Sequence, residues 1–397
     1  MELNCIKLSL GIKEIISYAL DMIINPIKRG EVMPLESWRL LDIGPIDPIE
    51  TQTIYDMIAQ GITEGESENT LIICWPAEPL VSLGHFQEIE ADIDTKFCRE
   101  NNIVYTRRVI GGGGVYLDDG QMFYQLIGRI DSPTTPRKID DYYRKFLEAP
   151  VQAYRNLGIQ AEFKPVNDLI VNGKKISGNG AGDVGDARIL TGNLIFDFNF
   201  DMMVKVLKVP DEKFRDKISK SLRERMTTIK LETGSMPDRT EVKDDLVRLY
   251  EETLDIELVR ADLNSWEKGR MAELRPKYLS DEWLHWRRGG RLTDARSVRI
   301  SATTSVGTSN YKAPGGLIRA TVEVVDEKIN EVIISGDFTM LPNEGISQLE
   351  REIINSSLEG DELLRRLRVA YSENGIISPG VDPEDIEKSI RMAISQE

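Results

Sequence analysis

The chain has 397 residues, of which 41% are hydrophobic and 29% charged, and its formal net charge is -16. This length is too great for one compact core and indicates two or three domains of an ordinary soluble globular protein. The acidic excess argues against a general nucleic-acid-binding surface, so no nucleic-acid partner is expected. Any site for an anionic ligand must therefore concentrate its positive charge locally.

The few cysteines and histidines also restrict the chemistry. Cys5, Cys74 and Cys98 are odd in number and show no CxxC spacing, which favours buried, reduced thiols over disulfides. His85 and His285 are too few for a histidine-rich metal site, and a zinc site built from these cysteines is not expected.

Residues 1–35 are expected to form an N-terminal helical extension, to which the sequence assigns no role. Residues 12–25 repeat apolar side chains at helical spacing but include Lys13, Glu14 and Asp21. This run is too short and too charged to span a bilayer, and no small-residue cleavage site follows it. We therefore predict an amphipathic helix packed on the body of the protein, no membrane partner and a cytoplasmic location.

Residues 36–262 are expected to form a catalytic domain that begins with a strand near Trp38. Residues 71–75 and 80–84 have the continuous apolar pattern of buried strands, and two prolines separate them. The domain therefore opens with three strands in its first 50 residues.

The second half of this domain mixes a helix with short strands. Residues 141–157 repeat apolar side chains at helical spacing, with Pro150 expected to kink the helix and Gly158 to end it. Residues 169–171 lead into an asparagine-glycine pair typical of a tight hairpin turn, and residues 194–198 are expected to form a returning strand. This mixed order predicts an α+β fold and not a regularly alternating α/β sheet.

Residues 263–397 are expected to form a small α+β C-terminal accessory domain. Apolar side chains alternate along residues 318–324, and a turn leads to residues 332–334, which predicts a β-hairpin. Two helices are expected to follow. The last has Asp382 as its N-cap and Pro383 at its first helical position.

Residues 107–120 (RRVIGGGGVYLDDG) contain the first candidate site. Four consecutive glycines serve no core packing and are costly to order, which indicates a ligand that approaches the backbone closely. Their amides can donate to phosphate or carboxylate oxygens, and Arg107 and Arg108 supply positive charge on a planar fork. A Lys-Ser/Thr ending is missing, which excludes a P-loop. Residues 115–119 and 122–127 are expected to pair as a hairpin, which excludes a Rossmann loop. The alternative is a flexible surface turn.

Residues 166–183 (VNDLIVNGKKISGNGAGD) contain the second candidate site. Lys174 and Lys175 follow the hairpin turn at successive strand positions, so one is expected to be solvated and the other directed inward. A lysine near an acyl phosphate neutralises the charge that builds up in phosphoryl or acyl transfer. Paired lysines at a hairpin are by themselves most often a solvated tip, so the combination with the glycine run matters.

Together the two segments resemble the lipoate–protein ligase A family, whose signatures are an Arg-Arg run before glycines and an Asn-Asp…Lys-(Ile/Val)-Ser-Gly block. The resemblance covers roughly residue 36 to the C-terminus and includes these further segments: Trp38-Arg39-Leu40, Gly84-His85-Phe86-Gln87, Thr191-Gly192-Asn193-Leu194, residues 217–229, Gly315-Gly316-Leu317 and Gly336-Asp337-Phe338. It implies a fold shared with biotin ligases, in which helices flank a mixed β-sheet and a small accessory domain follows.

The resemblance also implies a two-step reaction. The carboxylate of lipoate attacks the α-phosphate of ATP to give lipoyl-AMP and pyrophosphate, and a lysine of an acceptor lipoyl domain then attacks the mixed anhydride. The implied acceptors are 2-oxoacid dehydrogenase subunits and the glycine-cleavage H protein. Mg²⁺ is expected with ATP, although the sequence identifies no ligands for it.

Site residues follow from the matching motifs. Lys175 is implied to contact the acyl carbonyl and the phosphate as the catalytic lysine. The implied nucleotide-binding residues are Arg108, Gly111, Gly112, Gly113, Gly114, Val115, Tyr116, Asn167 and Asp168, together with Lys175.

Three positions depart from the family pattern. Leu117 stands where members usually carry histidine, and Gln121 replaces an asparagine. The histidine-glycine-threonine segment here reads Thr191-Gly192-Asn193, again without its histidine. An imidazole is therefore missing twice, which leaves the acyl group, lipoate or a related medium-chain acid such as octanoate, open.

Two other functions remain open beside the ATP-dependent ligase. One is an ATP-independent octanoyl or lipoyl transferase, which generally uses a cysteine nucleophile. Cys74 and Cys98 precede the glycine run, outside the segment expected for that nucleophile, and the accessory domain also favours a ligase. The other is a non-catalytic carrier-binding homologue, against which the retention of Lys175 and both arginines argues.

Overall fold

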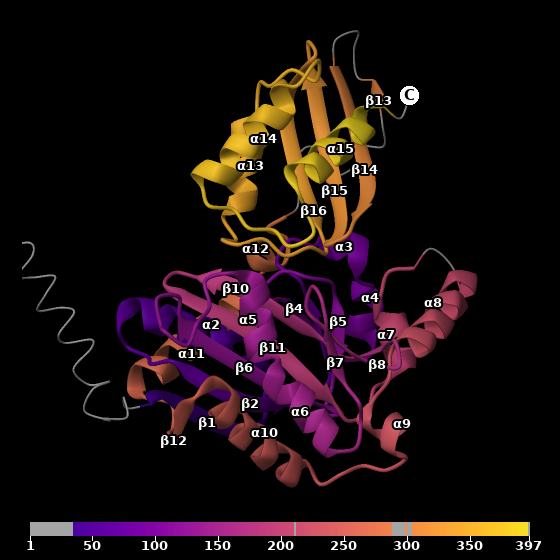
Figure 1. Ribbon diagram of the computed structural model, residues 1–397. Helices are drawn as coiled ribbons and strands as arrows, with labels where there is room; N and C mark the ends of the chain where they lie inside the picture. Colours follow the sequence, from indigo (N-terminus) through magenta and orange to yellow (C-terminus); the bar gives the residue numbers. More distant parts are fainter. Residues whose placement is uncertain (1–34, 210–211, 288–297, 300–303, 396–397) are drawn as a thin grey trace, which may run out of the picture.

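The computed structural model describes residues 35–209, 212–287, 298–299 and 304–395. A large domain is built on a six-stranded sheet, and a smaller domain with a four-stranded sheet stands on one end of it (Figure 1). The predicted α+β fold is confirmed. The helix predicted within the first 35 residues lies outside the described residues. In the described ranges, no helix has the length and apolar character needed to cross a membrane.

The central sheet is mixed, with the strand order β10-β11-β6-β2-β1-β12. The first two strands of the chain and the last strand of this sheet run parallel, whereas β6, β11 and β10 pair in antiparallel fashion. The bounds of its strands are β1 (Glu36–Ile46), β2 (Thr70–Pro76), β6 (Gln121–Arg129), β10 (Asn179–Val184), β11 (Ala187–Ile195) and β12 (Ile256–Arg260). The predicted returning strand at residues 194–198 therefore starts earlier and ends at Ile195.

Helices cover both faces of this sheet, because side chains of alternate strand residues are apolar on each side. On one face Trp38 and Tyr124 pack with residues of α5 (Ile139–Phe146), α6 (Glu148–Asn156) and α10 (Arg239–Leu254). On the other face, residues such as Leu41 and Phe123 pack with α2 (Glu50–Glu64) and α11 (Ser265–Tyr278). Although α11 follows the predicted boundary at residue 262, its Leu274 and Tyr278 thus share the core of the large domain.

The helix predicted over residues 141–157 is two helices that meet at Leu147. Pro150 lies in the first turn of α6. Because proline has no backbone N–H, it cannot make the hydrogen bond that would continue α5 into α6. Gly158 follows the second helix with φ +81°, a left-handed conformation that glycine tolerates. The proline therefore ends one helix and starts the next.

Two three-stranded sheets lie beside the central sheet. The first has the order β4-β3-β5, and the second β7-β8-β9. Their strands are β3 (Leu80–Leu83), β4 (Val104–Arg107), β5 (Val115–Leu117), β7 (Glu162–Lys164), β8 (Asp168–Val171) and β9 (Lys174–Ser177). Asn172 and Gly173 have φ of 50° and 78°, which confirms the predicted tight turn between β8 and β9.

The hairpin predicted between residues 115–119 and 122–127 is wrong. β5 pairs with β3, whereas β6 lies between β2 and β11 in the central sheet. The turn between them does not fold the chain back on itself, because the carbonyl of Gly120 accepts hydrogen bonds from the amides of Phe196 and Asp197. The turn therefore passes the chain from one sheet to the other.

The accessory domain confirms the predicted hairpin between β15 (Gly316–Val325) and β16 (Lys328–Gly336). β14 (Thr304–Ala313) and β13 (Val298–Arg299) complete its antiparallel sheet. Three helices follow, one more than predicted: α13 (Gly345–Ile353), α14 (Glu362–Glu373) and α15 (Pro383–Ile394). Asp382 caps the last helix in a capping box, as expected. Shorter helices elsewhere are α3 (Ile89–Asp92), α4 (Thr95–Glu100), α7 (Phe200–Val206), α8 (Glu212–Arg225), α9 (Ile229–Thr233) and α12 (Asp281–Leu284).

Candidate active site

A cavity of about 710 Å³ lies where the large domain meets the accessory domain. The glycine run, the β8–β9 hairpin and the chain leading into β10 line it on one side, and loops of the accessory domain line it on the other. Basic side chains outnumber acidic ones among the lining residues: Arg108, Lys164, Lys175 and Lys312 against Asp168 and Asp337. The lining of this cavity thus has an excess of positive charge within an acidic chain, as an anion site requires.

Most residues predicted for the site line this cavity. They are Arg108, Gly111, Gly112, Gly113, Gly114, Val115, Asn167, Asp168 and Lys175. Tyr116 does not, because alternation along β5 turns its side chain away from its neighbours, and it packs with Val81 and Leu83. The two segments that are far apart in the sequence therefore face one space, and Tyr116 is the exception.

Arg107 does not belong to the site, contrary to the expectation from its place before the glycine run. Its side chain is fully buried, and among the described residues its guanidinium donates only to main-chain carbonyls, those of Gly84, His85, Gln87, Trp283 and Leu284, at 2.6–3.1 Å. Burial lowers the pKa of Arg107 to about 9. Arg107 therefore fixes the loop after β3 against α12.

Arg108 reaches the cavity, but its guanidinium bonds to the main chain of the site itself. It donates to the carbonyl oxygens of Gly111 and Gly113 at 2.8 and 2.9 Å and to that of Ser82 at 3.0 Å. Burial lowers the pKa of Arg108 to about 10. Arg108 therefore holds the glycine run in its conformation, and its positive charge lies next to the cavity.

The glycine run makes close approaches that side chains would prevent. Gly112 has φ +94° and donates its amide to the carbonyl of Phe338 at 2.9 Å. A Cβ at Gly111 would lie 2.5 Å from the same carbonyl oxygen, so the run seats the accessory domain. Within the described chain, the amides of Gly113 and Gly114 make no hydrogen bond. These two amides are available to an anionic ligand.

Lys175 is the inward lysine of the hairpin, as predicted. Its Nζ lies 2.6 Å from Oδ1 of Asp168 on the neighbouring strand, and both side chains are about one-third exposed. Its carbonyl accepts the amide of Thr227 at 2.9 Å, which ties β9 to the segment after α8. Lys174 is not among the cavity-lining residues.

Asn167 makes a reciprocal pair with Asn179 and so shapes the cavity wall. Its Nδ2 donates to the carbonyl of Asn179 at 2.6 Å, and the Nδ2 of Asn179 donates back to the carbonyl of Asn167 at 3.0 Å. The hydroxyl of Tyr124 donates to Oδ1 of Asn179 at 2.6 Å. Asn179 and its partner Tyr124 were not predicted as site residues.

The accessory domain contributes residues that sequence reasoning missed. Lys312 and Asp337 line the cavity with their charged groups 3.7 Å apart. Gly315, which lines the cavity beside them, is packed so closely that a Cβ would lie 2.1 Å from the carbonyl of Pro379. The glycine pair before β15 and the glycine before Asp337 were visible as motifs, but their sequence position gave no sign that they face the first domain.

The lining of the cavity also includes apolar side chains. Ile110, Leu117 and Phe123 all line the cavity and belong to the buried cluster under α2. Leu117 and Thr191, the two positions where the family pattern has histidine, are thus both part of the lining. An apolar lining suits the hydrocarbon part of an acyl substrate.

Thiols and metal clusters are missing from this site as far as the described residues go. Cys74 and Cys98 are buried and neither lines the cavity. The described part of the chain also contains no group of three or more His, Cys, Asp or Glu side chains that could hold a metal ion.

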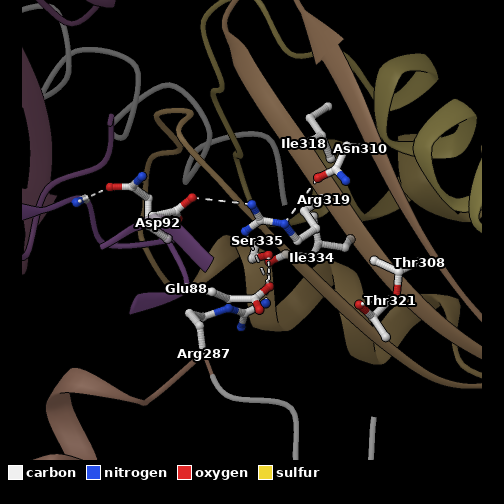
Figure 2. Close-up of polar contacts among 12 residues, drawn as sticks. Glu88, Asp92, Arg287, Thr308, Asn310, Ile318, Arg319, Thr321, Ile334 and Ser335 are labelled. Atoms are coloured by element: carbon white, nitrogen blue, oxygen red, sulfur yellow. Dashed lines mark hydrogen bonds and ion pairs between the residues drawn. The ribbon is translucent and has the colours of Figure 1, made fainter. Parts of the chain in front are cut away.

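Polar and aromatic contacts hold the accessory domain against the loop after β3. The amide of Gly336 donates to the carbonyl of Phe86 at 2.9 Å, and the rings of Phe86 and Phe338 stack at 5.1 Å. Figure 2 shows Arg319 reaching from β15 to Asp92, an ion pair of 3.4 Å. Glu88 accepts a hydrogen bond from the hydroxyl of Ser335 beside it (Figure 2). These contacts keep the two walls of the cavity together.

The central sheet, its flanking helices and the cavity define a catalytic domain of the biotin/lipoate ligase class, and solved structures share this fold. The bipartite lipoate protein ligase of Thermoplasma acidophilum, described with its E2 lipoyl domain, is 28% identical with a TM-score of 0.56, over 67% of this chain and 100% of that one. Lipoate-protein ligase A bound with ATP is 27% identical with a TM-score of 0.53, over 63% of this chain and 98% of that one.

The chain belongs to the lipoyl protein ligase A/B family, whose catalytic domain matches residues 47–251. It is 28% identical to the octanoyltransferase LipM of Moorella thermoacetica over 271 residues, 64% of this chain and 99% of that protein. It is 29% identical to the lipoate-protein ligase LplJ of Bacillus subtilis over 309 residues, 75% of this chain and 87% of that protein. The family therefore contains both ligases and transferases.

Proposed function

We propose that this protein is an ATP-dependent lipoate–protein ligase, which forms lipoyl-AMP and transfers the lipoyl group to a lysine of an acceptor lipoyl domain. The observation that carries the proposal is one cavity whose lining combines Lys175 and the glycine run, in which the amides of Gly113 and Gly114 are unbonded within the described residues, with apolar side chains. Concentrated negative charge and a hydrocarbon chain are the two features that an acyl adenylate presents. The likeness to a solved ligase A bound with ATP supports the use of this nucleotide.

In the first step, a carboxylate oxygen of lipoate attacks the α-phosphorus of ATP and the bond to the pyrophosphate oxygen breaks. Negative charge gathers on the phosphoryl oxygens, and fixed donors aimed at that charge lower the barrier. Lys175 supplies the cation, and the amides of Gly113 and Gly114 supply neutral donors. Arg108 keeps those amides in place through its bonds to the carbonyls of the run.

In the second step, the ε-amino group of the acceptor lysine attacks the carbonyl carbon of the mixed anhydride. The bond to AMP breaks, the amide forms and the amine loses a proton. Lys175 and the same amides then stabilise the departing phosphate. Because a solved ligase of the family is described with its E2 lipoyl domain, we propose lipoyl domains of 2-oxoacid dehydrogenase subunits or the glycine-cleavage H protein as acceptors.

Mg²⁺ is proposed to enter with ATP. In the described part of the cavity, Asp168 and Asp337 are the lining carboxylates, and Asp168 is already paired with Lys175. The protein can therefore supply few oxygen ligands, and phosphate oxygens and water would supply the rest, which is a common arrangement for Mg²⁺. Asp337 lies 3.7 Å from Lys312, so each lining carboxylate already has a lysine beside it and neither is assigned as a metal ligand.

The similarity to LipM makes an ATP-independent octanoyltransferase the second candidate. Thiol-based transfer needs an accessible thiolate. Burial raises the pKa of Cys98 to about 11 and that of Cys74 well above its usual range, and neither thiol lines the cavity. The described residues therefore favour the ligase.

Pyrophosphate exchange tests the proposal directly. The purified chain, lipoate, ATP, Mg²⁺ and radiolabelled pyrophosphate should give lipoate-dependent incorporation of label into ATP, and adding an apo lipoyl domain should yield the lipoylated protein. Octanoate in place of lipoate measures the preference for the acyl group. Without exchange, transfer from an octanoylated donor protein would identify a transferase. Inactivity in both assays would leave a non-catalytic carrier-binding protein and overturn the proposal.

We expect a chain without thiols to remain active. Replacing Cys74 and Cys98 with alanine and Cys5, which lies outside the described residues, with serine should leave the lipoylation rate within about threefold of wild type. Loss of the buried Cys74 sulfur should lower stability by about 1 kcal/mol, which thermal unfolding measures as the control for folding. A folded triple variant that had lost lipoylation at least 100-fold, on the order of what a nucleophile contributes, would contradict the ligase mechanism.

A further inference from the structure

We propose that Gln121 and Asn193 are positioning residues that join the two halves of the site through a buried hydrogen-bonded bridge. This inference rests on the proposed function and deepens it, because it concerns how Lys175 is held relative to the glycine run. Both side chains are buried, with 1% and 8% exposure. Neither was predicted as a site residue, although both positions depart from the family pattern.

The two side chains meet on one face of the central sheet. Gln121 begins β6 and lies opposite Ile195, whereas Asn193 lies opposite Phe123 on the same strand pair. Positions two apart on a strand point to the same side, so Gln121 and Asn193 are diagonal neighbours. The Nδ2 of Asn193 donates to Oε1 of Gln121 at 2.7 Å.

Asn193 connects this pair to the lysine strand. Its Oδ1 accepts the main-chain amide of Gly178 at 2.8 Å. Gly178 is the single residue between β9 and β10, where the chain leaves the small sheet for the central one. The stem of Lys175 lies over it, with Cε 4.0 Å from the point that a Cβ of Gly178 would occupy. Asn193 therefore holds Gly178 in place, and the side chain of Lys175 packs next to Gly178.

Gln121 extends the bridge toward the glycine run. Its Nε2 points to the carbonyl of Tyr116 at a longer 3.4 Å, and Tyr116 is in the strand that begins directly after the glycines. The amide of Gly178 can only donate, so Oδ1 of Asn193 must accept. Nδ2 must then donate to Oε1 of Gln121, which leaves Nε2 for the Tyr116 carbonyl and the Asp118 carboxylate. The amide of Gly178 therefore determines which atoms donate and which accept in each hydrogen bond of the bridge.

Gln121 and Asn193, which both depart from the family pattern, are direct hydrogen-bond partners in this structure. An asparagine at 121 is shorter by one methylene, and a threonine at 193 has a single oxygen in place of an amide. Here the longer glutamine meets an asparagine that can accept on one side and donate on the other. Changing one partner alone should leave a buried polar group unpaired, which is the costly case.

A double-mutant cycle tests the bridge. We expect Gln121→Asn and Asn193→Thr each to lower the kcat of lipoate-dependent exchange about tenfold, with KM for ATP and lipoate within about threefold. The combined variant restores the family pair and should return kcat to within about threefold of wild type. Effects that multiply to about 100-fold in the double variant would show that the two residues do not act together and would overturn the proposal.

Hydrogen exchange at the Gly178 amide provides a readout that does not depend on catalysis. Exchange should be faster than wild type in Asn193→Thr and should slow again in the double variant. Equal protection in all three proteins would also overturn the bridge. If wild-type protein showed no pyrophosphate exchange, the proposed function would fail while this measurement still decided the bridge.

Gln125 offers a matched control on the same strand. Its side chain is also fully buried, and its Nε2 donates to the carbonyl of Thr51 at 2.9 Å, away from the lysine strand. Gln125→Leu should lower the melting temperature while leaving kcat within about twofold of wild type. A loss of kcat equal to that of the bridge variants would show that any buried amide on β6 matters, and the specific role of Gln121 would be refuted.

Discussion

Replacing Lys175 with alanine is expected to abolish lipoate-dependent pyrophosphate exchange, with a loss of at least about 1000-fold in kcat. The ammonium group of Lys175 is the cation on the β8–β9 wall of the cavity, and it is oriented by Asp168 at 2.6 Å. Arg108 cannot substitute, because its guanidinium is held by the carbonyls of the glycine run. Lys312 belongs to the accessory domain and lies beside Asp337. Lys164 also lines the cavity, but it is in β7, on the other side of Asp168 from Lys175.

Lys174→Ala provides the matched control one residue away. Lys174 is not part of the cavity lining, so the Lys174→Ala variant should catalyse pyrophosphate exchange within about threefold of the wild-type rate. Stability should change little in the Lys175 variant, since a pair that is about one-third exposed contributes little to folding. If Lys174→Ala were inactive and Lys175→Ala fully active, the assignment of Lys175 as the lysine that faces the cavity would be wrong.

The parts of the site that the sequence predicted are those whose conformation is fixed by neighbouring residues in the chain. The glycine run and the Asn172-Gly173 turn impose their backbone geometry themselves, so their sequence predicted both an exceptional loop, which lines the cavity, and the hairpin. Lys312 and Asp337 come from another domain, and nothing local indicates that they face the same cavity. Non-local packing of this kind is beyond reasoning from spacing.

The paired arginines show a second limit. Neighbouring residues at the end of a strand point in different directions, and the sequence does not say which direction faces the ligand. The structure places Arg108 behind the glycine run and Arg107 in the interior. A similar ambiguity produced the wrong hairpin between β5 and β6, because alternation predicts strands without naming their partners. The family resemblance assigned only Arg108 to nucleotide binding, whereas the charge pattern alone treated the two arginines alike.

Arg107→Leu is accordingly expected to act on folding before it acts on chemistry, with a loss of at least about 3 kcal/mol in the free energy of unfolding. The substitution takes this donor away from five carbonyls, three in the loop that carries His85 and two in the segment of Trp283. Urea unfolding followed by tryptophan fluorescence measures the loss.

Two further variants decide whether Arg107 is structural. Arg107→Lys keeps the charge but lacks the planar fork that reaches several carbonyls at once, so it should recover only part of the stability. Arg129, an exposed arginine paired with Asp131, is the matched control, and Arg129→Leu should leave the urea midpoint unchanged. If Arg107→Leu unfolded at the wild-type midpoint yet failed to bind ATP, the arginine would act on the ligand after all. Its five hydrogen bonds to main-chain carbonyls would then have to rearrange when the nucleotide binds, and Arg107 would not hold the loop after β3 against α12 in a fixed position.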